Sequence, residues 1–178
     1  MTATINRQIP GTVGVVGLGY TGLPLALSLA GSGLLTIGLD TDRGKVSDLL
    51  VGRSYLPGIA DDELVATAEW FEPTVDPRRL AGLDAYVICA PTPTADGGDA
   101  DLTYVDAAAD LVAPLIRAGA LVVLQSMVPP ETVAQLAARL SRGSGLVPGV
   151  DFHFAMAPER IDALGLPSHE GTDAATRP

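Results

Sequence analysis

Short apolar runs alternate with helical patterns along almost the whole chain, and this alternation restricts the possible folds more than any other feature. The runs are too short for helices and lie at residues 12–16, 35–40, 70–75, 85–90, 121–125 and 152–157. Patterns with helical periodicity fill the intervals at residues 20–30, 42–50, 61–69, 104–117 and 131–140, and Pro114 is expected to bend the fourth of these helices. Strands separated by helices pair in parallel, and right-handed crossovers place the helices on both faces of the sheet. The sequence therefore predicts an α/β fold with a doubly wound, mostly parallel, six-stranded sheet.

Three glycines follow the first apolar run with GxGxxG spacing, as Gly17, Gly19 and Gly22. Gly17 permits a tight turn, Gly19 lets the backbone approach a pyrophosphate, and Gly22 lets the next helix pack closely on the sheet. The second apolar run ends at Asp40, about 20 residues after the glycines, where a carboxylate accepts hydrogen bonds from ribose hydroxyls and repels a 2′-phosphate. This combination predicts a Rossmann-like domain that binds NAD. The alternative is that the glycines only form a tight turn and that Asp40 caps the next helix.

Length, charge and cysteine content limit the other classes of function. The chain has 178 residues, a formal net charge of −10 and one cysteine. We expect one domain at residues 11–165 and a polar, disordered tail at 166–178. An acidic chain without runs of Lys or Arg is not expected to bind nucleic acid, and the short apolar runs predict a cytoplasmic protein without a membrane segment. The loop acids Asp96, Asp99 and Asp101 lack EF-hand spacing, so no metal site is predicted.

Six stretches in collinear order carry a resemblance that is more specific than the glycine motif. They are GLGYTGLPLA (17–26), GLDTDRGKVSDL (38–49), GRSYLPGIADDEL (52–64), YVICAPTP (86–93), DLTYVDAAADLVAPLIRAGALVVLQSMVPPET (101–132) and SGLVPGVDFHFAMAPERI (144–161). Together they resemble the NAD-dependent nucleotide-sugar 6-dehydrogenases, the family that acts on UDP-glucose, GDP-mannose and UDP-N-acetylmannosamine. The last stretch is most similar to the enzymes that act on N-acetylated UDP-hexosamines. The resemblance implies the NAD-binding domain of an oxidoreductase that converts the sugar's C6 alcohol to a carboxylate with two NAD.

The resemblance also implies roles for single residues. The glycine loop and Asp40 would hold the adenosine diphosphate half of NAD, and the CAPTP turn would lie near the nicotinamide half. Glu159, in the PER motif, matches a family glutamate that assists proton transfers and thioester hydrolysis; the alternative is an exposed ion pair with Arg160. The predicted cofactor-binding residues are Gly17, Gly19, Tyr20, Thr21, Gly22, Asp40, Lys45, Pro91, Thr92 and Ser126.

The sequence departs from the family at positions that bear on catalysis. Met127 stands where the family has a threonine whose hydroxyl joins the active-site hydrogen bonds, and a thioether cannot donate one. Glu131 replaces a glycine of the same string, and the resemblance stops near Ile161. The family's nucleophilic cysteine, a lysine and an asparagine come from central and C-terminal segments that we expect to be missing here. Cys89, in the fourth apolar run, is expected to be structural.

Three hypotheses follow. The chain is the cofactor domain of a nucleotide-sugar dehydrogenase that is not catalytic alone and takes a UDP-sugar only if the missing segment is supplied. Alternatively, it is a non-enzymatic NAD-binding or regulatory module that has lost the chemistry. A third hypothesis is an inert or unstable chain, because the missing segment covers apolar surface and, in the family, supports a homodimer.

Overall fold

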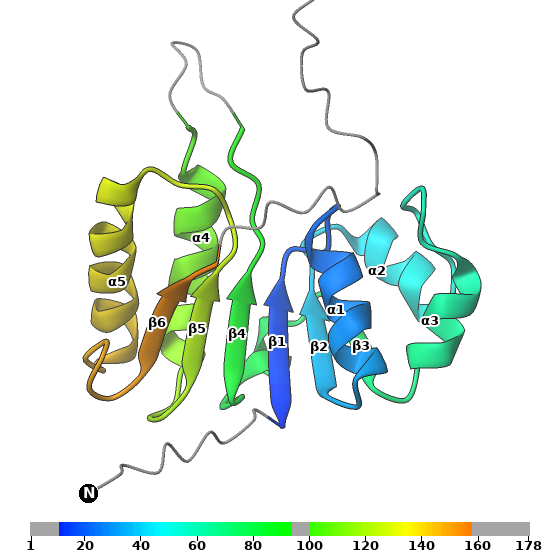
Figure 1. Ribbon diagram of the computed structural model, residues 1–178, viewed down its shortest axis with the longest axis horizontal. Coiled ribbons are helices and arrows are strands. Elements are labelled where there is room, and N and C mark those ends of the chain that lie inside the picture. Colours follow the sequence, from blue (N-terminus) through cyan, green and yellow to red (C-terminus); the bar gives the residue numbers. More distant parts are fainter. Residues whose placement is uncertain (1–10, 94–99, 158–178) are drawn as a thin grey trace, which may run out of the picture.

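A computed structural model describes residues 11–93 and 100–157, and within these ranges six strands form one parallel sheet (Figure 1). The strand order is β3-β2-β1-β4-β5-β6, with each neighbouring pair parallel. The strands are β1 (Thr12–Val16), β2 (Leu35–Leu39), β3 (Phe71–Thr74), β4 (Ala85–Ile88), β5 (Leu121–Leu124) and β6 (His153–Met156). The chain crosses from β3 at one edge to β4 beside β1, which is the order of a doubly wound Rossmann sheet. The predicted fold class is therefore confirmed.

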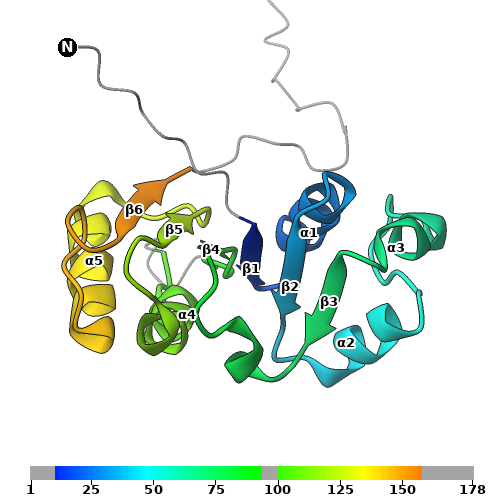
Figure 2. The same cartoon turned by 90° about the horizontal axis from the view of Figure 1, so that it is seen from below.

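The helices cover both faces of this sheet. They are α1 (Gly22–Gly31), α2 (Arg43–Leu50), α3 (Asp61–Thr67), α4 (Thr103–Val112) and α5 (Pro130–Ser144), with 3-10 turns η1 (Pro77–Leu80) and η2 (Ala113–Leu115). Viewed from below in Figure 2, α1 and α4 lie on opposite sides of the sheet. Acidic residues fill the first turn of α3, and Pro130 occupies the first turn of α5, where a missing N–H costs no hydrogen bond.

Each face of the sheet packs into its own apolar core. On the α1 side, Val15, Leu23 and Phe71 belong to a cluster drawn from residues 13–71 together with Ala85. On the α4 and α5 side, Tyr86 belongs to a cluster drawn from residues 80–152 together with residues 16, 37 and 39. Strand side chains alternate between the two clusters because successive residues of a strand point to opposite faces.

The expectation for Pro114 was wrong in one respect. The helix predicted at residues 104–117 is not bent there. It ends at Val112, and the 3-10 turn Ala113–Leu115 contains Pro114. Proline lacks the N–H that would continue the helix, and its ring crowds the preceding turn.

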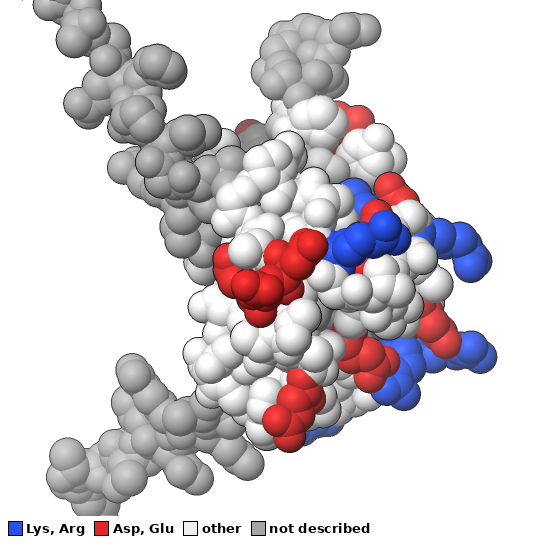
Figure 3. All heavy atoms as spheres, turned by 90° about the vertical axis from the view of Figure 1, so that its right-hand side faces the viewer, with Lys and Arg blue, Asp and Glu red and all other residues white. Residues whose placement is uncertain are grey.

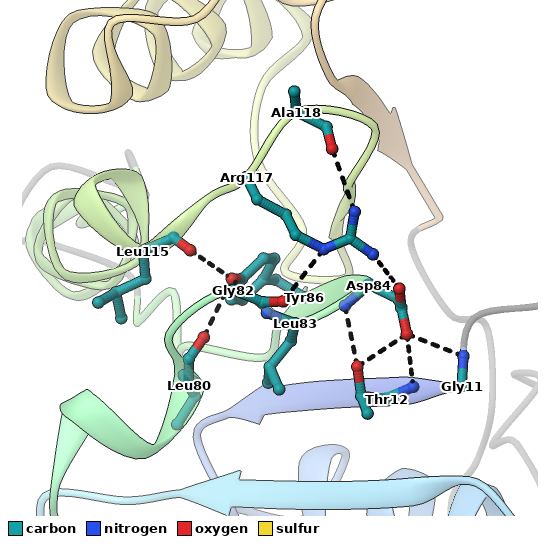
Figure 4. Close-up of polar contacts among 10 residues, drawn as sticks. All are labelled: Gly11, Thr12, Leu80, Gly82, Leu83, Asp84, Tyr86, Leu115, Arg117 and Ala118. Atoms are coloured by element: carbon teal, nitrogen blue, oxygen red, sulfur yellow. Dashed lines mark hydrogen bonds and ion pairs between the residues drawn. The ribbon is translucent and has the colours of Figure 1, made fainter.

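Asp84 ties three segments together at the amino end of the sheet (Figure 4). Its Oδ2 accepts hydrogen bonds from the amides of Gly11 (3.0 Å) and Thr12 (2.9 Å) and from the Thr12 hydroxyl (2.8 Å). Arg117 pairs with its Oδ1 and also donates to the Gly82 carbonyl (3.1 Å). The Thr12 hydroxyl is the largest cause that lowers the pKa of the Asp84 carboxyl, and the two amides and Arg117 act in the same direction. The ionised carboxylate therefore links β1, β4 and the segment before β5.

The charged side chains on the α2 and α3 side are mixed in sign (Figure 3). Basic groups on this face lie beside acidic groups and do not form a separate basic patch. In the same part of the chain Arg53 pairs with Asp48 (3.0 Å) and Arg79 with Glu72 (2.6 Å). Within residues 11–93 and 100–157, no helix is long and apolar enough to cross a membrane.

Candidate functional site

A cavity of about 770 Å³ opens at the carboxyl ends of β1, β2, β4 and β5. In open parallel sheets this edge, where the strand order reverses, is the place where ligands bind. The cavity is lined by nearly all the predicted cofactor residues, namely Gly17, Gly19, Tyr20, Thr21, Asp40, Lys45, Pro91, Thr92 and Ser126. Gly22 is not among the lining residues, and Glu159 lies outside the described residues.

The three glycines meet different physical demands. Gly17 has a φ of +93°, and a Cβ there would lie 2.8 Å from the Cys89 carbonyl oxygen, so a larger residue would be both strained and crowded. A Cβ on Gly22 would lie 1.8 Å from the Gly17 carbonyl oxygen, so the close neighbour of Gly22 is the glycine loop itself. Gly19 is the opposite case, since a Cβ there would meet no atom of residues 11–93 and 100–157 within 4 Å. The backbone at Gly19 is therefore open to a ligand.

The N-terminus of α1 faces the same cavity. The helix begins at Gly22, and the side chain of its N-cap residue Thr21 makes no capping hydrogen bond. Leu23 is the first residue whose amide donates back into the loop, to the Gly19 carbonyl (3.1 Å). The amides just before it belong to the first turn, where N–H groups have no intrahelical partner and the helix dipole is positive. This arrangement suits a phosphate.

Asp40 anchors the glycine loop to the end of β2. Its Oδ2 accepts the Leu18 amide (2.9 Å) and lies 3.4 Å from Lys45 Nζ, while its Oδ1 accepts the Asp42 amide (2.9 Å). The N-cap of α2 is Asp42, whose Oδ1 accepts the Gly44 amide (2.8 Å), so the alternative that Asp40 caps this helix is wrong. A carboxylate has about four lone-pair positions, which leaves Asp40 able to accept further hydrogen bonds from the cavity.

The turns after β4 and β5 are joined by side-chain hydrogen bonds. The Ser126 hydroxyl donates to the Ala90 carbonyl (2.6 Å), and the Cys89 thiol donates to Gln125 Oε1 (3.0 Å). Both pairs lie on the cavity wall. Met127 lines the same wall with 70% of its surface exposed. The position that the resemblance assigns to a threonine hydroxyl thus presents a thioether to the cavity.

One wall of the cavity was not predicted from the sequence. It comes from one side of α4 and consists of Tyr104, Ala107, Ala108 and Leu111. The helical pattern showed that a helix follows the loop after β4. Apolar and aromatic residues on its surface gave no signal of which turn would border a ligand cavity, because the same spacing is typical of core packing.

Comparison with known proteins identifies the family and several relatives. The sequence model of the UDP-glucose/GDP-mannose dehydrogenase family, NAD binding domain, matches residues 11–167. A UDP-N-acetyl-D-mannosamine dehydrogenase from Pyrococcus horikoshii is 37% identical over 153 residues, which cover 84% of this chain and 36% of that protein. An NDP-N-acetyl-D-galactosaminuronic acid dehydrogenase from Ralstonia solanacearum is 36% identical over 168 residues, covering 89% of this chain and 38% of that protein.

Solved structures agree with these matches. The UDP-D-ManNAc dehydrogenase of P. horikoshii superposes with a TM-score of 0.80 at 35% identity, covering 84% of this chain and 36% of that one. A ternary complex of a GDP-mannose dehydrogenase from Pseudomonas aeruginosa gives a TM-score of 0.77 at 28% identity, and the match covers 83% of this chain and 36% of that one. The chain thus spans little more than a third of the length of the relatives that it matches.

Proposed function

The chain belongs to the UDP-glucose/GDP-mannose dehydrogenase family as an NAD-binding domain, and from this premise we propose which of its groups hold the cofactor and which reaction the domain serves. The observation that carries the proposal is the cavity of about 770 Å³ between the open backbone of Gly19 and the Asp40–Lys45 pair. The space at Gly19, which a Cβ would fill, fits a group that approaches the main chain closely. The residues present therefore suit a dinucleotide.

Each part of the cavity has a proposed partner in NAD. Gly17, Gly19 and the amides at Tyr20 and Thr21 take the pyrophosphate at the N-terminus of α1, which Gly22 allows to pack against the loop. Asp40 accepts the hydroxyls of the adenosine ribose, with Lys45 beside it. The nicotinamide half lies along the residues after β4 and β5, namely Pro91, Thr92 and Ser126. NAD, when bound, supplies the hydride acceptor.

We propose that the reaction served is oxidation of the C6 alcohol of a nucleotide sugar, with a UDP-N-acetylhexosamine as the substrate class. The support is that the two curated relatives described above carry the names of dehydrogenases of N-acetylated sugar nucleotides or of their uronic acids. In the same proposal, Glu159 transfers protons during the reaction, and the working assembly is a homodimer. Both assignments rest on the resemblance of the sequence to the family.

Binding of NAD in preference to NADP tests the cofactor assignment. Isothermal titration calorimetry of the folded chain is expected to show NAD binding at least about tenfold more tightly than NADP, because the 2′-phosphate would meet the Asp40 carboxylate. The Asp40→Asn variant is expected to bind NAD more weakly and to reduce the preference over NADP to less than about threefold, since the repelling charge is gone.

A matched variant controls for the general loss of one negative charge. Asp48→Asn removes a carboxylate from α2 that pairs with Arg53 and is not a lining residue of the cavity. Its affinities for both dinucleotides are expected to equal those of the unaltered chain. A folded chain that fails to bind NAD at millimolar concentration would refute the assignment.

Met127 favours a second candidate function, an NAD-binding or regulatory module without dehydrogenase activity. Its exposed thioether cannot donate a hydrogen bond, whereas the resemblance implies a threonine hydroxyl at this position that takes part in the active-site hydrogen bonds. Under our first proposal this chain, mixed with NAD and UDP-N-acetylmannosamine, forms no NADH, because the resemblance places the cysteine nucleophile in the part of the relatives that this chain does not match. The decisive measurement adds the remaining two thirds of a relative as a separate chain. NADH absorbance that then appears supports the cofactor domain of an enzyme, and continued inactivity of the folded complex supports the non-enzymatic module.

A further inference from the structure

The main chain of Leu18, the residue between Gly17 and Gly19, forms a closed cycle of contacts with three side chains, those of Asp40, Lys45 and Tyr55. The Leu18 amide donates to Asp40 Oδ2 (2.9 Å), and its carbonyl accepts the hydroxyl of Tyr55. Lys45 Nζ completes this cycle of contacts, since it lies 3.4 Å from Asp40 Oδ2 and 5.6 Å from the centroid of the Tyr55 aromatic ring. Both polar groups of the Leu18 residue are therefore held by side chains from outside the glycine loop.

Tyr55 lies in the segment between α2 and α3, and both of its neighbours in the chain are anchored to the rest of the fold. The amide of Ser54 donates to Asp61 Oδ1 (2.7 Å) at the start of α3. Leu56 is buried in the apolar core on the α1 side, and its amide donates to Ser54 Oγ (3.2 Å). Because both neighbours of Tyr55 are anchored, the phenol is placed by the fold and not by the glycine loop that it contacts.

Tyr55 does not line the cavity that we assign to NAD, whereas Lys45 and Asp40 do. Tyr55 is thus placed to act on a ligand in this cavity through Leu18 and Lys45, the residues that it holds. Burial is the largest cause that raises the pKa of the Tyr55 hydroxyl, and the negative charges of Asp40 and Asp42 raise it further. The hydroxyl is thus a protonated donor throughout the neutral range.

We propose that Tyr55 is a positioning residue of the dinucleotide site, which sets the Leu18 peptide and Lys45 for the adenosine diphosphate half of NAD. This inference rests on the proposed cofactor assignment. The Tyr55 hydroxyl fixes the carbonyl side of Leu18, so that the Gly19 backbone keeps the place where a pyrophosphate approaches. The Tyr55 ring restrains the Lys45 ammonium through a cation–π contact, so that the charge stays beside Asp40.

Tyr55→Phe tests the hydroxyl, and Tyr86→Phe is its matched control. Tyr86 is fully buried, and its hydroxyl lies within hydrogen-bond distance of the carbonyls of Leu80 (3.0 Å) and Leu115 (2.6 Å), none of which belongs to a lining residue of the cavity. Tyr55→Phe is expected to weaken binding of NAD and of ADP about five- to tenfold, because a displaced binding loop loses contacts that need fixed geometry. Tyr86→Phe is expected to lower the melting temperature while the affinities for NAD and ADP stay unchanged.

The contact between the aromatic ring of Tyr55 and the Lys45 ammonium is tested separately with Tyr55→Leu and Lys45→Met. Tyr55→Leu is expected to weaken ADP binding more than Tyr55→Phe does, and this difference is expected to vanish when Lys45→Met is present in both variants. Such a cycle isolates the coupling between the Tyr55 ring and Lys45. A structural defect would persist in the Lys45→Met background.

A measurement on the unaltered chain is independent of how the variants fold. In NMR spectra, titration with ADP is expected to shift the ring resonances of Tyr55 but not those of Tyr86. If Tyr55→Phe binds ADP like the unaltered chain, or if Tyr86→Phe loses as much affinity, the positioning role is overturned. If the unaltered chain binds neither NAD nor ADP, the cofactor assignment itself fails and this inference falls with it.

Discussion

The Gly22→Ala variant is expected to lose NAD binding by at least about 100-fold, because displacement of a binding loop by about 1 Å has effects of that size. The added Cβ would lie 1.8 Å from the carbonyl oxygen and 2.9 Å from the carbonyl carbon of Gly17. These neighbours are backbone atoms, so either the glycine loop or the start of α1 must move. The same overpacking is expected to lower the free energy of unfolding by about 3 kcal/mol. Calorimetric titration with NAD and thermal unfolding measure the two effects.

Two further glycines provide controls for this variant. Gly31→Ala adds the same methyl group at the other end of α1, where the nearest atom outside the helix is 3.9 Å away. Its NAD affinity is expected to be unchanged and its stability equal or higher, since alanine favours helix over glycine.

Gly19→Ala is expected to separate folding from binding. A Cβ at Gly19 meets no atom of the described part of the chain within 4 Å, so the melting temperature is expected to stay the same. The methyl group would occupy the space that we assign to the pyrophosphate, so NAD affinity is expected to fall. Gly22→Ala with normal NAD affinity would contradict the close approach of α1 to the loop, and Gly19→Ala with normal affinity would contradict the placement of the phosphates.

The Asp84→Asn variant is expected to unfold at a temperature about 8 °C lower, corresponding to a loss of about 2–3 kcal/mol. Asp84 accepts two amides and one hydroxyl through Oδ2 and pairs with Arg117 through Oδ1. An asparagine keeps one oxygen and turns the other position into a donor, so either Arg117 or the Thr12 side faces a donor without an acceptor. Thermal unfolding at neutral pH measures this loss.

The same carboxylate gives a pH dependence with a defined sign. The folded pKa of Asp84 is lowered, so its contribution to stability is fully present above the unfolded value of about 3.9 and is lost as pH falls through the folded value. The unaltered chain is therefore expected to lose more stability than Asp84→Asn between about pH 5 and pH 3. Glu72, Asp76 and Asp101 also have lowered pKa values and act in both proteins.

Asp48→Asn again serves as the matched control, since it removes one charge from an exposed ion pair. Such pairs contribute about 0–1 kcal/mol, so a small change in melting temperature is expected. Equal effects of Asp48→Asn and Asp84→Asn, or an unchanged acid profile in Asp84→Asn, would show that the Asp84 contacts do not stabilise the fold.

Local sequence was sufficient to predict the fold and to predict that the glycine loop and Asp40 lie together at the cavity. The β1 run, the three glycines and the second strand ending at Asp40 follow one another within 30 residues, and strand geometry then brings Asp40 back to the loop. The end of α4 was predicted less well, because a proline inside an apolar helical pattern can either bend a helix or end it.

The sequence patterns did not predict contacts between segments that are far apart in the chain. The hydroxyl of Tyr55 meets a carbonyl 37 residues away, and Asp84 meets Thr12 over 72 residues. Tyrosine after a helix and aspartate before a strand are common in any α/β chain, and their partners are main-chain groups that no motif marks. The segment at residues 51–60, which contains Tyr55, is long for a connection between two helices, but its length does not indicate which residue contacts the glycine loop.

The position of β1 in the sheet has a consequence for how the chain folds during synthesis. β1 is synthesised before the other five strands of this sheet and lies in its centre, so its second edge stays unpaired until β4 emerges at residues 85–88. The buried members of the cluster on the α1 side come from residues 13–71 apart from Ala85, and Val87, Cys89 and Leu121 pack against it from later in the chain. Most of this half can therefore collapse early with one strand edge exposed. An exposed edge can pair with another nascent chain. Pairing of β4 with β1 closes that edge, and the hydrogen bonds between Asp84 and Thr12 hold the start of β4 against β1.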